Sequence, residues 1–230
     1  MSALLSIPIF WLAATLLVFE GADALSRRSG RHPLCHPVVI ATPILIGLLL
    51  TTRTPYPAYR DATQVLGLLL GPAVVGMAVP IWRQRAVIKR LAVPIALALA
   101  CGAVTAIVSA VGILTLFGAP REILASIAPR ATTTPVAMAM ATQLGGVPAL
   151  AAIIVMFAGI VGAMTATPLF NAMKLTDYRA RGFAGGVSAH GFAAARAFQV
   201  NATAGAFASL GMALNAVTTA ILLSLLSLLL

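Results

Sequence analysis

Charged side chains are scarce in this sequence, and their scarcity excludes an ordinary water-soluble domain. Asp, Glu, Lys and Arg make up 9% of the 230 residues, whereas hydrophobic residues make up 60%, and the mean hydropathy is +1.02. A soluble domain carries about 25% charged residues. Runs of about 20 apolar residues recur along the chain, as in membrane-spanning helices. We therefore predict an all-α polytopic membrane protein with about 6–8 membrane segments, including re-entrant or broken helices.

Cysteines are few, and recognisable catalytic motifs are lacking. The two cysteines, Cys35 and Cys101, are far apart and form neither a disulfide framework nor a metal-binding spacing. The sequence has no GxSxG, HExxH or phosphate-binding loop and no paired carboxylates. We therefore predict a protein that is not an enzyme and that uses no metal or cofactor.

Acidic residues are few, and none lies in the centre of an apolar run. They are Glu20, Asp23, Asp61, Glu122 and Asp177. This distribution argues against carboxylate-based sodium or proton sites inside the membrane. The formal net charge is +10, but the basic residues lie in short loops between apolar runs, which is typical of topology signals and lipid-headgroup contacts. We expect membrane lipid, and no nucleic acid, as a partner.

The apolar runs indicate a single integral membrane domain over residues 1–230. The runs cover about 3–25, 37–51, 61–82, 91–117, 132–143, 147–170, 182–198 and 203–229. Twelve helical residues reach ~18 Å, which is too short for the ~30 Å hydrocarbon core. We predict that 132–143 is re-entrant, with a short crossing helix as the alternative.

The basic loops favour an N-terminus outside the cell in a multi-pass membrane protein. The loops after the first, third and sixth runs carry three, four and three Lys or Arg, and those after the second and fourth carry two each. If 132–143 does not cross, the three richer loops share one side, as the positive-inside rule requires.

Two helix-weakened stretches suggest an internal duplication with halves at about 1–117 and 118–230. They read LGPAVVGMAVP and GGVSAHGFAAAR. Interrupted segments at matching positions point to a binding site between inverted repeats of a transporter. The first stretch also overlaps a small-xxx-small spacing, Gly67 and Gly71, of the kind that packs membrane helices together.

The segment at 132–143 begins with features of a helix N-terminus that suit an anion. Thr132, Thr133 and Thr134 are followed by Pro135; threonine is a favoured N-cap and proline belongs in the first helical turn. A helix N-terminus carries unpaired N–H donors and partial positive charge. The alternative is that the threonines only cap a short structural helix.

A histidine and an arginine stand six residues apart in the run at 182–198. His190 and Arg196 would lie ~120° apart on a regular helix, so both could meet one ligand only if the helix broke between them, for which Gly191 offers flexibility. Imidazole and guanidinium beside hydroxyls favour a small anion. The alternatives are an interhelical hydrogen bond for His190 and a snorkelling position at the helix end for Arg196.

Three stretches resemble the LrgB (CidB/LrgB) family. They read LLGPAVVGMAVPIWRQRAVIKR, PRATTTPVAMAMATQLGGVPALAA, and GFAGGVSAHGFAAARA through GAFASLGMALNAVTTAIL, in order from about 61 to about 222. The resemblance implies a multispanning inner-membrane protein that acts with a small holin-like LrgA/CidA-type partner. It also implies either control of murein hydrolases and autolysis or, as for related chloroplast proteins, transport of glycolate, glycerate or pyruvate. The implied fold is that of transporters with inverted repeats.

Some positions depart from the family pattern. Ala131 stands where a family serine is usual, Ala193 and Ala194 replace a Gly-Thr pair between His190 and Arg196, and Gln199 replaces a glutamate. The predicted substrate-binding set is Thr132, Thr133, Thr134, Pro135, Gly145, Gly146, Ser188, His190, Gly191 and Arg196.

We therefore predict a facilitator or secondary transporter of a small monocarboxylate. The threonines and helix amides would receive the anion, Arg196 would offset its charge and His190 would donate a hydrogen bond and couple a proton. The alternative is a regulator of holin-like function, murein hydrolases and autolysis that moves no solute. A single cavity lined by Thr134, His190 and Arg196 would favour transport, and close packing around scattered residues would favour regulation. Self-association into a homo-oligomer is a further open alternative.

Overall fold

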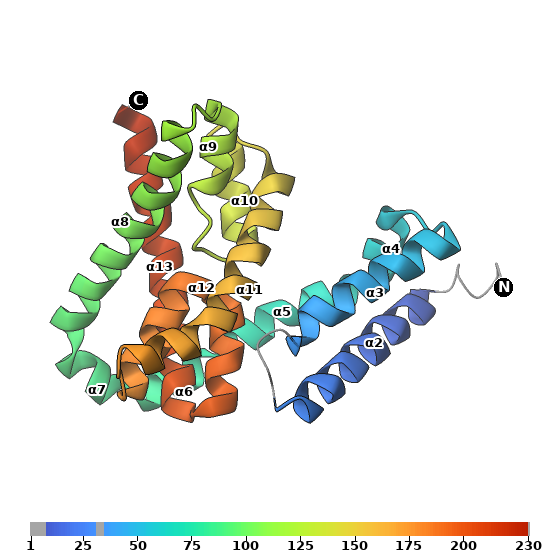
Figure 1. Cartoon of the computed structure of the whole chain (residues 1–230), viewed down its shortest axis with the longest axis horizontal. Coiled ribbons are helices and arrows are strands. Elements are labelled where there is room, and N and C mark those ends of the chain that lie inside the picture. Colours follow the sequence, from blue (N-terminus) through green and yellow to red (C-terminus); the bar gives the residue numbers. More distant parts are fainter. Residues whose placement is uncertain (1–7, 31–34, 230) are drawn as a thin grey trace. The chain divides into compact units, whose positions relative to one another are not determined.

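The computed structural model describes residues 8–30 and 35–229, and these residues form helices and connecting turns without a strand (Figure 1). The helices are α2 (Pro8–Arg28), α3 (Pro37–Thr52), α4 (Tyr56–Ala62), α5 (Gln64–Gly76), α6 (Ala78–Arg83), α7 (Arg85–Arg90), α8 (Ala92–Leu116), α9 (Arg121–Ile127), α10 (Thr134–Gln143), α11 (Pro148–Ala172), α12 (Tyr178–Val200) and α13 (Ala202–Leu229). The predicted all-α class is confirmed. Residues 3–7 of the predicted first run and Arg31 of the loop after it lie outside the described residues.

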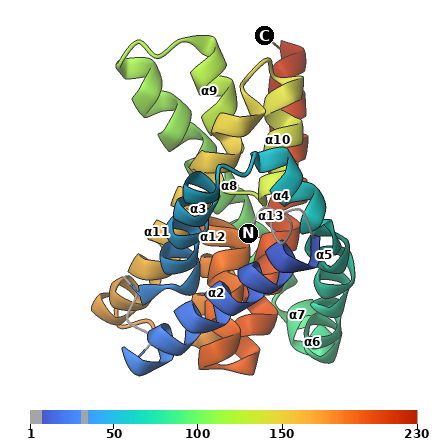
Figure 2. The ribbon, with the colours of Figure 1, turned by 90° about the vertical axis from the view of Figure 1, so that its right-hand side faces the viewer.

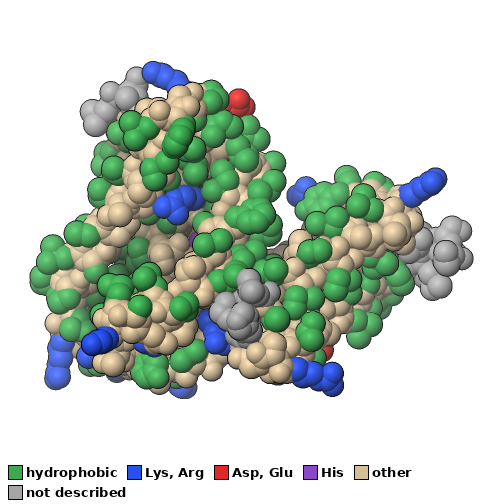
Figure 3. All heavy atoms as spheres, viewed as in Figure 1, with side chains coloured by type: hydrophobic (Ala, Val, Ile, Leu, Met, Phe, Trp, Pro, Cys, Tyr) green, Lys and Arg blue, Asp and Glu red, His purple; other side chains and the backbone are tan. Residues whose placement is uncertain are grey.

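Within residues 8–30 and 35–229, five helical stretches are long and apolar enough to cross a membrane. They are Pro8–Arg28, Gln64–Arg83, Ala92–Leu116, Pro148–Ala172 and Ala202–Ser227. A sixth arises if α3 and α4, which meet at a bend of 120°, count as one span. Large apolar side chains such as Leu17, Val93 and Leu116 are exposed, and Figure 3 shows hydrophobic side chains spread over the visible face. Because such a surface is unfavourable in water, the chain is a multi-pass membrane protein.

The predicted third run, about 61–82, matches the candidate span Gln64–Arg83. Within this span a turn at Met77 separates α5 from α6. Pro80 has no N–H to donate to the carbonyl of Gly76, four residues earlier, so the regular hydrogen-bond ladder is interrupted at this point.

The chain forms two compact units, Met1–Gly76 and Met77–Leu230, here called the N-terminal and C-terminal units. In the N-terminal unit, α2 packs against α3 and α4. Trp11 is buried and meets Tyr59 edge-on at 5.7 Å, and the hydroxyls of Thr15 and Tyr59 lie 3.0 Å apart. The predicted single domain with two repeat halves stays a prediction.

The C-terminal unit is organised around the tight pairing of α12 with α13, which Figures 1 and 2 both show side by side. Gly182 and Gly186 lie directly against the backbone carbonyls of Ala204 and Ala208, so a Cβ at either glycine would collide with main-chain atoms. Helix α11 covers another face of α12, and α10 packs on α11. The glycine-rich sequence of α12 is thus explained by close helix contact.

Candidate anion-binding site

The short helix α10 begins where the sequence predicted a helix N-terminus. Thr133 is its N-cap in extended conformation (φ −75°, ψ 151°), Thr134 is its first residue and Pro135 lies in the first turn. Thr132 is buried, and its Oγ1 donates to the carbonyl of Pro129 at 2.8 Å. The hydroxyl of Thr133 makes no capping bond. The half-buried Thr133 and Thr134 therefore offer their hydroxyls more readily than Thr132 does.

An arginine that the sequence assigned to a loop lies beside this helix N-terminus. Arg130 precedes Thr133 by three residues and is half-buried. One of its guanidinium nitrogens donates to Ser109 Oγ of α8 at 3.4 Å. Among the described residues no carboxylate pairs with Arg130. Arg130 thus places a partly buried positive charge in the segment that leads into the α10 N-terminus.

Helix α12 is interrupted, and the interruption corrects the predicted position of the break. Ala189 (φ −134°, ψ 19°) and His190 (φ 39°, ψ −127°) have non-helical backbone angles, whereas Gly191 continues the helix. The break therefore lies at Ala189 and His190, before Gly191, and Arg196 belongs to the helical stretch that follows it. A positive φ is strained for a residue with a side chain and costs about 1–3 kcal/mol.

The imidazole of His190 is held inside the helix packing. His190 is 3% exposed, and its Nε2 lies 3.2 Å from the carbonyl oxygen of Val155 on α11. The ring also fills the space beside Gly159, where a Cβ would lie 2.7 Å from the imidazole. The contact between Nε2 and the carbonyl of Val155 is an interhelical hydrogen bond, which is the predicted alternative to a ligand contact for His190.

The two interrupted segments converge on one buried amide. Asn215 of α13 is fully buried, and its Nδ2 donates to the carbonyl of Ala131, just before α10, at 2.8 Å and to that of Val187, just before the α12 break, at 3.1 Å. Its Oδ1 lies 3.4 Å from the hydroxyl of Thr219, which donates to it. Asn215 thus satisfies main-chain carbonyls from both segments at once.

Three other predicted site residues have local backbone or packing roles. Gly145 has a positive φ of 76°, and a Cβ on Gly146 would collide with Ser126. Ser126 Oγ in turn accepts the N–H of Val147 at 2.8 Å, so both glycines form the tight turn into α11. The hydroxyl of Ser188 donates to the carbonyl of Ala184 at 2.8 Å.

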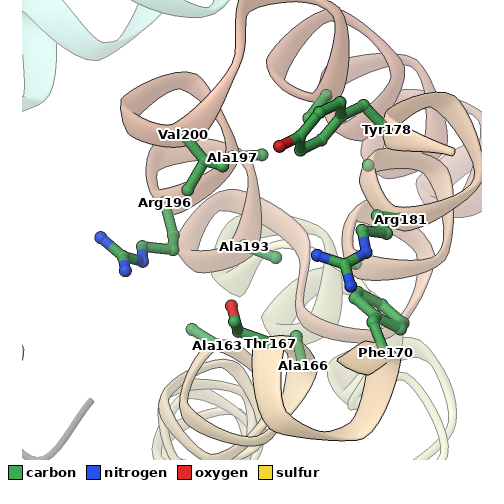
Figure 4. Close-up of a pocket in the computed structure, with 13 residues that line it drawn as sticks. Ala163, Ala166, Thr167, Phe170, Tyr178, Arg181, Ala193, Arg196, Ala197 and Val200 are labelled. Carbon is green, nitrogen blue, oxygen red and sulfur yellow. The ribbon is translucent and has the colours of Figure 1, made fainter. Parts of the chain in front are cut away.

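Arg196 lines a different pocket from the threonines and His190. This pocket lies among α11, α12 and α13, and its wall includes Thr167, Tyr178, Arg181 and Arg196 (Figure 4). Neither Thr132–Thr134 nor His190 belongs to its wall. Arg196 is half-buried near the end of α12 and donates to Gln199 Oε1 at 3.4 Å. The pocket that Arg196 borders is therefore not the shared cavity of Thr134, His190 and Arg196 that would favour transport.

Sequence reasoning missed Arg130 and Asn215. Both carry a recognisable signal: Arg130 directly precedes the threonine cluster, and Asn215 is an amide within the last apolar run. Arg130 lies in a loop and Asn215 carries no charge, so neither stands out among the ionisable groups inside the apolar runs. Polar side chains at depth in a membrane protein are expected to satisfy buried groups.

The comparisons with known proteins cover nearly the whole chain. The family model of the LrgB-like family matches residues 15–229. The uncharacterized protein YwbG of Bacillus subtilis (strain 168) is 32% identical over 213 residues, which cover 93% of this chain and 94% of that protein. The holin-like protein CidB of Staphylococcus aureus (strain N315) is 26% identical over 221 residues, 96% of each chain.

No solved structure matches this chain, so the family assignment depends on sequence. The matched range takes in both compact units, the threonine cluster at α10, the broken α12 and Asn215. This chain belongs to the LrgB-like family.

Proposed function

We propose that this chain is a facilitator or secondary transporter of a small monocarboxylate of the pyruvate, glycolate or glycerate class. It acts in the inner (plasma) membrane with its N-terminus outside, together with a small LrgA/CidA-like membrane protein. The observation that carries the proposal is that Asn215 binds two carbonyls with one side-chain amide: that of Ala131, just before α10, and that of Val187, just before the α12 break.

Interrupted backbone within a membrane needs a reason, because each unsatisfied carbonyl or N–H costs several kcal/mol in hydrocarbon. Broken helices occur in transporters where their ends face a substrate. Here Asn215 compensates one carbonyl from each interrupted segment and holds the two segments together. A chain that served only as a packing scaffold would gain nothing from two such breaks at one place.

The charge around α10 selects an anion. Arg130, the α10 N-terminus and the hydroxyls of Thr133 and Thr134 are donors within five consecutive residues. In the C-terminal unit the acids are Glu122 at the start of α9 and Asp177 before α12, and Asp177 already pairs with Arg179. A carboxylate accepts bidentate hydrogen bonds from a guanidinium and further bonds from hydroxyls.

A second candidate function is regulation of holin-like function, murein hydrolases and autolysis without solute movement. The burial of Thr132 and His190 and the hydrogen bond of His190 to Val155 favour it, because a closely packed imidazole has no room for a ligand. The name of the staphylococcal relatives, holin-like protein CidB, points in the same direction.

Uptake into proteoliposomes distinguishes the two candidates. The purified chain, with and without its LrgA/CidA-like partner, is tested with labelled pyruvate, glycolate and glycerate. We expect uptake by the wild type and a loss of about tenfold or more for Arg130→Gln, since a charge-assisted contact is removed. Arg121→Gln, at the exposed start of α9, is the matched control and should transport normally.

Two results would redirect the proposal. Absence of uptake of all three acids, with and without the partner, favours the regulator. Normal uptake by Arg196→Ala would refute the charge-offsetting role predicted for Arg196 and leave Arg130 as the cation of the site.

A further inference from the structure

The pocket that Arg196 borders has a polar cluster of its own. It lies among α11, α12 and α13 and has a volume of about 60 Å³, several times the ~10–15 Å³ that one ordered water requires. Alanines and glycines form much of its wall, so the polar groups of Thr167, Tyr178 and Arg181 stand out within it.

Arg181 is held in place by contacts on one side. Its Nε donates to the carbonyl of Leu175 at 2.5 Å, another nitrogen donates to Asn171 Oδ1, and the guanidinium lies 5.9 Å from the centre of the Phe170 ring. Figure 4 shows the guanidinium directed toward the space between α11 and α12. Among the described residues no carboxylate pairs with Arg181. A fixed guanidinium loses little conformational entropy when an oxyanion binds.

Two hydroxyls point into the same space. Figure 4 shows the oxygens of Thr167 and Tyr178 directed toward the region that Arg181 faces, whereas the guanidinium of Arg196 points away from it. Within the part of the chain that the structure describes, neither hydroxyl has a hydrogen-bond partner. One cation and two available O–H donors around one hollow match the acceptor pattern of a phosphate or carboxylate group.

We propose that this pocket binds one oxyanion group, separate from the site at α10, and that its source is either the phosphate of an anionic lipid headgroup or a free small anion. The pocket adjoins the loop between α11 and α12, which carries Lys174. Basic loops beside membrane segments attract anionic lipid. The apolar alanine wall suits the glycerol and upper acyl carbons of a lipid.

The test measures binding to the full-length protein in detergent. The probes are phosphatidylglycerol, counted on the protein by native mass spectrometry, and inorganic phosphate, followed by thermal shift. Arg181→Gln should raise the dissociation constant of the probe that binds by about tenfold. The double variant Thr167→Val with Tyr178→Phe should raise it by about two- to fivefold, since it removes two neutral hydrogen bonds.

Arg179→Gln is the control, because it removes a neighbouring basic side chain that lies outside the pocket wall. The proposal is supported if phosphatidylglycerol or phosphate binding weakens in the pocket variants and stays unchanged in the control. Equal binding by the wild type and the double hydroxyl variant, or equal weakening by Arg179→Gln, would overturn it. The double variant also decides the matter if Arg181→Gln fails to fold. Uptake of the three acids by the Arg130→Gln variant tests the site at α10, and its outcome does not depend on these binding measurements.

Discussion

Two glycine pairs with the same spacing have different surroundings in this molecule. Gly182 and Gly186 of α12 lie against main-chain carbonyls of α13, whereas a Cβ on Gly67 or Gly71 of α5 would meet no described atom of its own unit within 4 Å. The small-xxx-small spacing is identical in both. The comparison teaches that spacing permits close helix approach, and that the neighbouring helix decides whether the approach occurs.

The same contrast extends to polar side chains. Near the α12 pair lie the buried Asn215 and Thr219, which form hydrogen bonds within the C-terminal unit. In the N-terminal unit, Arg27 pairs with Glu20 and Asp23 at the exposed end of α2. Exposed ion pairs contribute about 0–1 kcal/mol, so the stability of the C-terminal unit depends more strongly on its polar contacts.

Replacing a glycine of each pair with leucine should have the largest effect and separates the two regions most clearly. Gly186→Leu places four carbons against the carbonyl of Ala208, so we expect α12 and α13 to separate and the protein to aggregate or to be degraded. Gly71→Leu should fold at the wild-type level. Fluorescence-detected size-exclusion chromatography of membrane extracts measures both. A folded Gly186→Leu variant would contradict the packing described for α12 and α13.

Removing the amide of Asn215 should have the next largest effect. Asn215→Leu leaves the carbonyls of Ala131 and Val187 without this donor, which lowers the free energy of unfolding by about 1–3 kcal/mol for each buried group. It also removes the side chain that links the segment before α10 to the α12 break. We expect a lower unfolding temperature and loss of uptake. Ser224→Leu, at an exposed position of the same helix, is the control. Normal uptake by Asn215→Leu would argue against any role of this convergence in transport.

A smaller effect is expected from the neighbour of that amide. Thr219→Val removes the hydroxyl that donates to Asn215 Oδ1 and keeps the side-chain shape, so the loss should be about 0.5–1.5 kcal/mol. Thermal unfolding in detergent measures it. In an Asn215→Leu background the same change should have little effect, because the two residues share one interaction; full additivity would disprove the shared interaction.

The smallest expected effect is a pH dependence at the exposed N-cap of α12. The side-chain hydrogen bond from Arg179 holds the pKa of Asp177 below its usual 3.8. The folded state therefore gains stability from this carboxylate above pH 3.8 and loses it as the pH falls through the lowered pKa. Asp177→Asn should reduce the fall in unfolding temperature between about pH 5 and pH 2 relative to the wild type. Parallel curves for both proteins would show that the pair contributes nothing measurable.

The sequence predicted the helical class and most of the segments, because long apolar runs and prolines act locally. Pro148 opens α11, and Thr133 with Pro135 opens α10 as predicted. The site was predicted less completely, because its geometry depends on contacts between distant segments. Residue spacing alone could not show that Asn215 reaches Ala131, 84 residues away, or that the break in α12 precedes Gly191.

Ligand protection of a single thiol at the α10 entrance tests the account most directly. In a background with Cys35→Ser and Cys101→Ser, Thr133→Cys is labelled with a water-soluble thiol reagent, with Thr142→Cys at the exposed far end of α10 as the control. We predict that pyruvate, glycolate or glycerate slows labelling at residue 133 and leaves residue 142 unaffected. Equal labelling rates at residue 133 with and without each acid would contradict an anion site at this helix N-terminus.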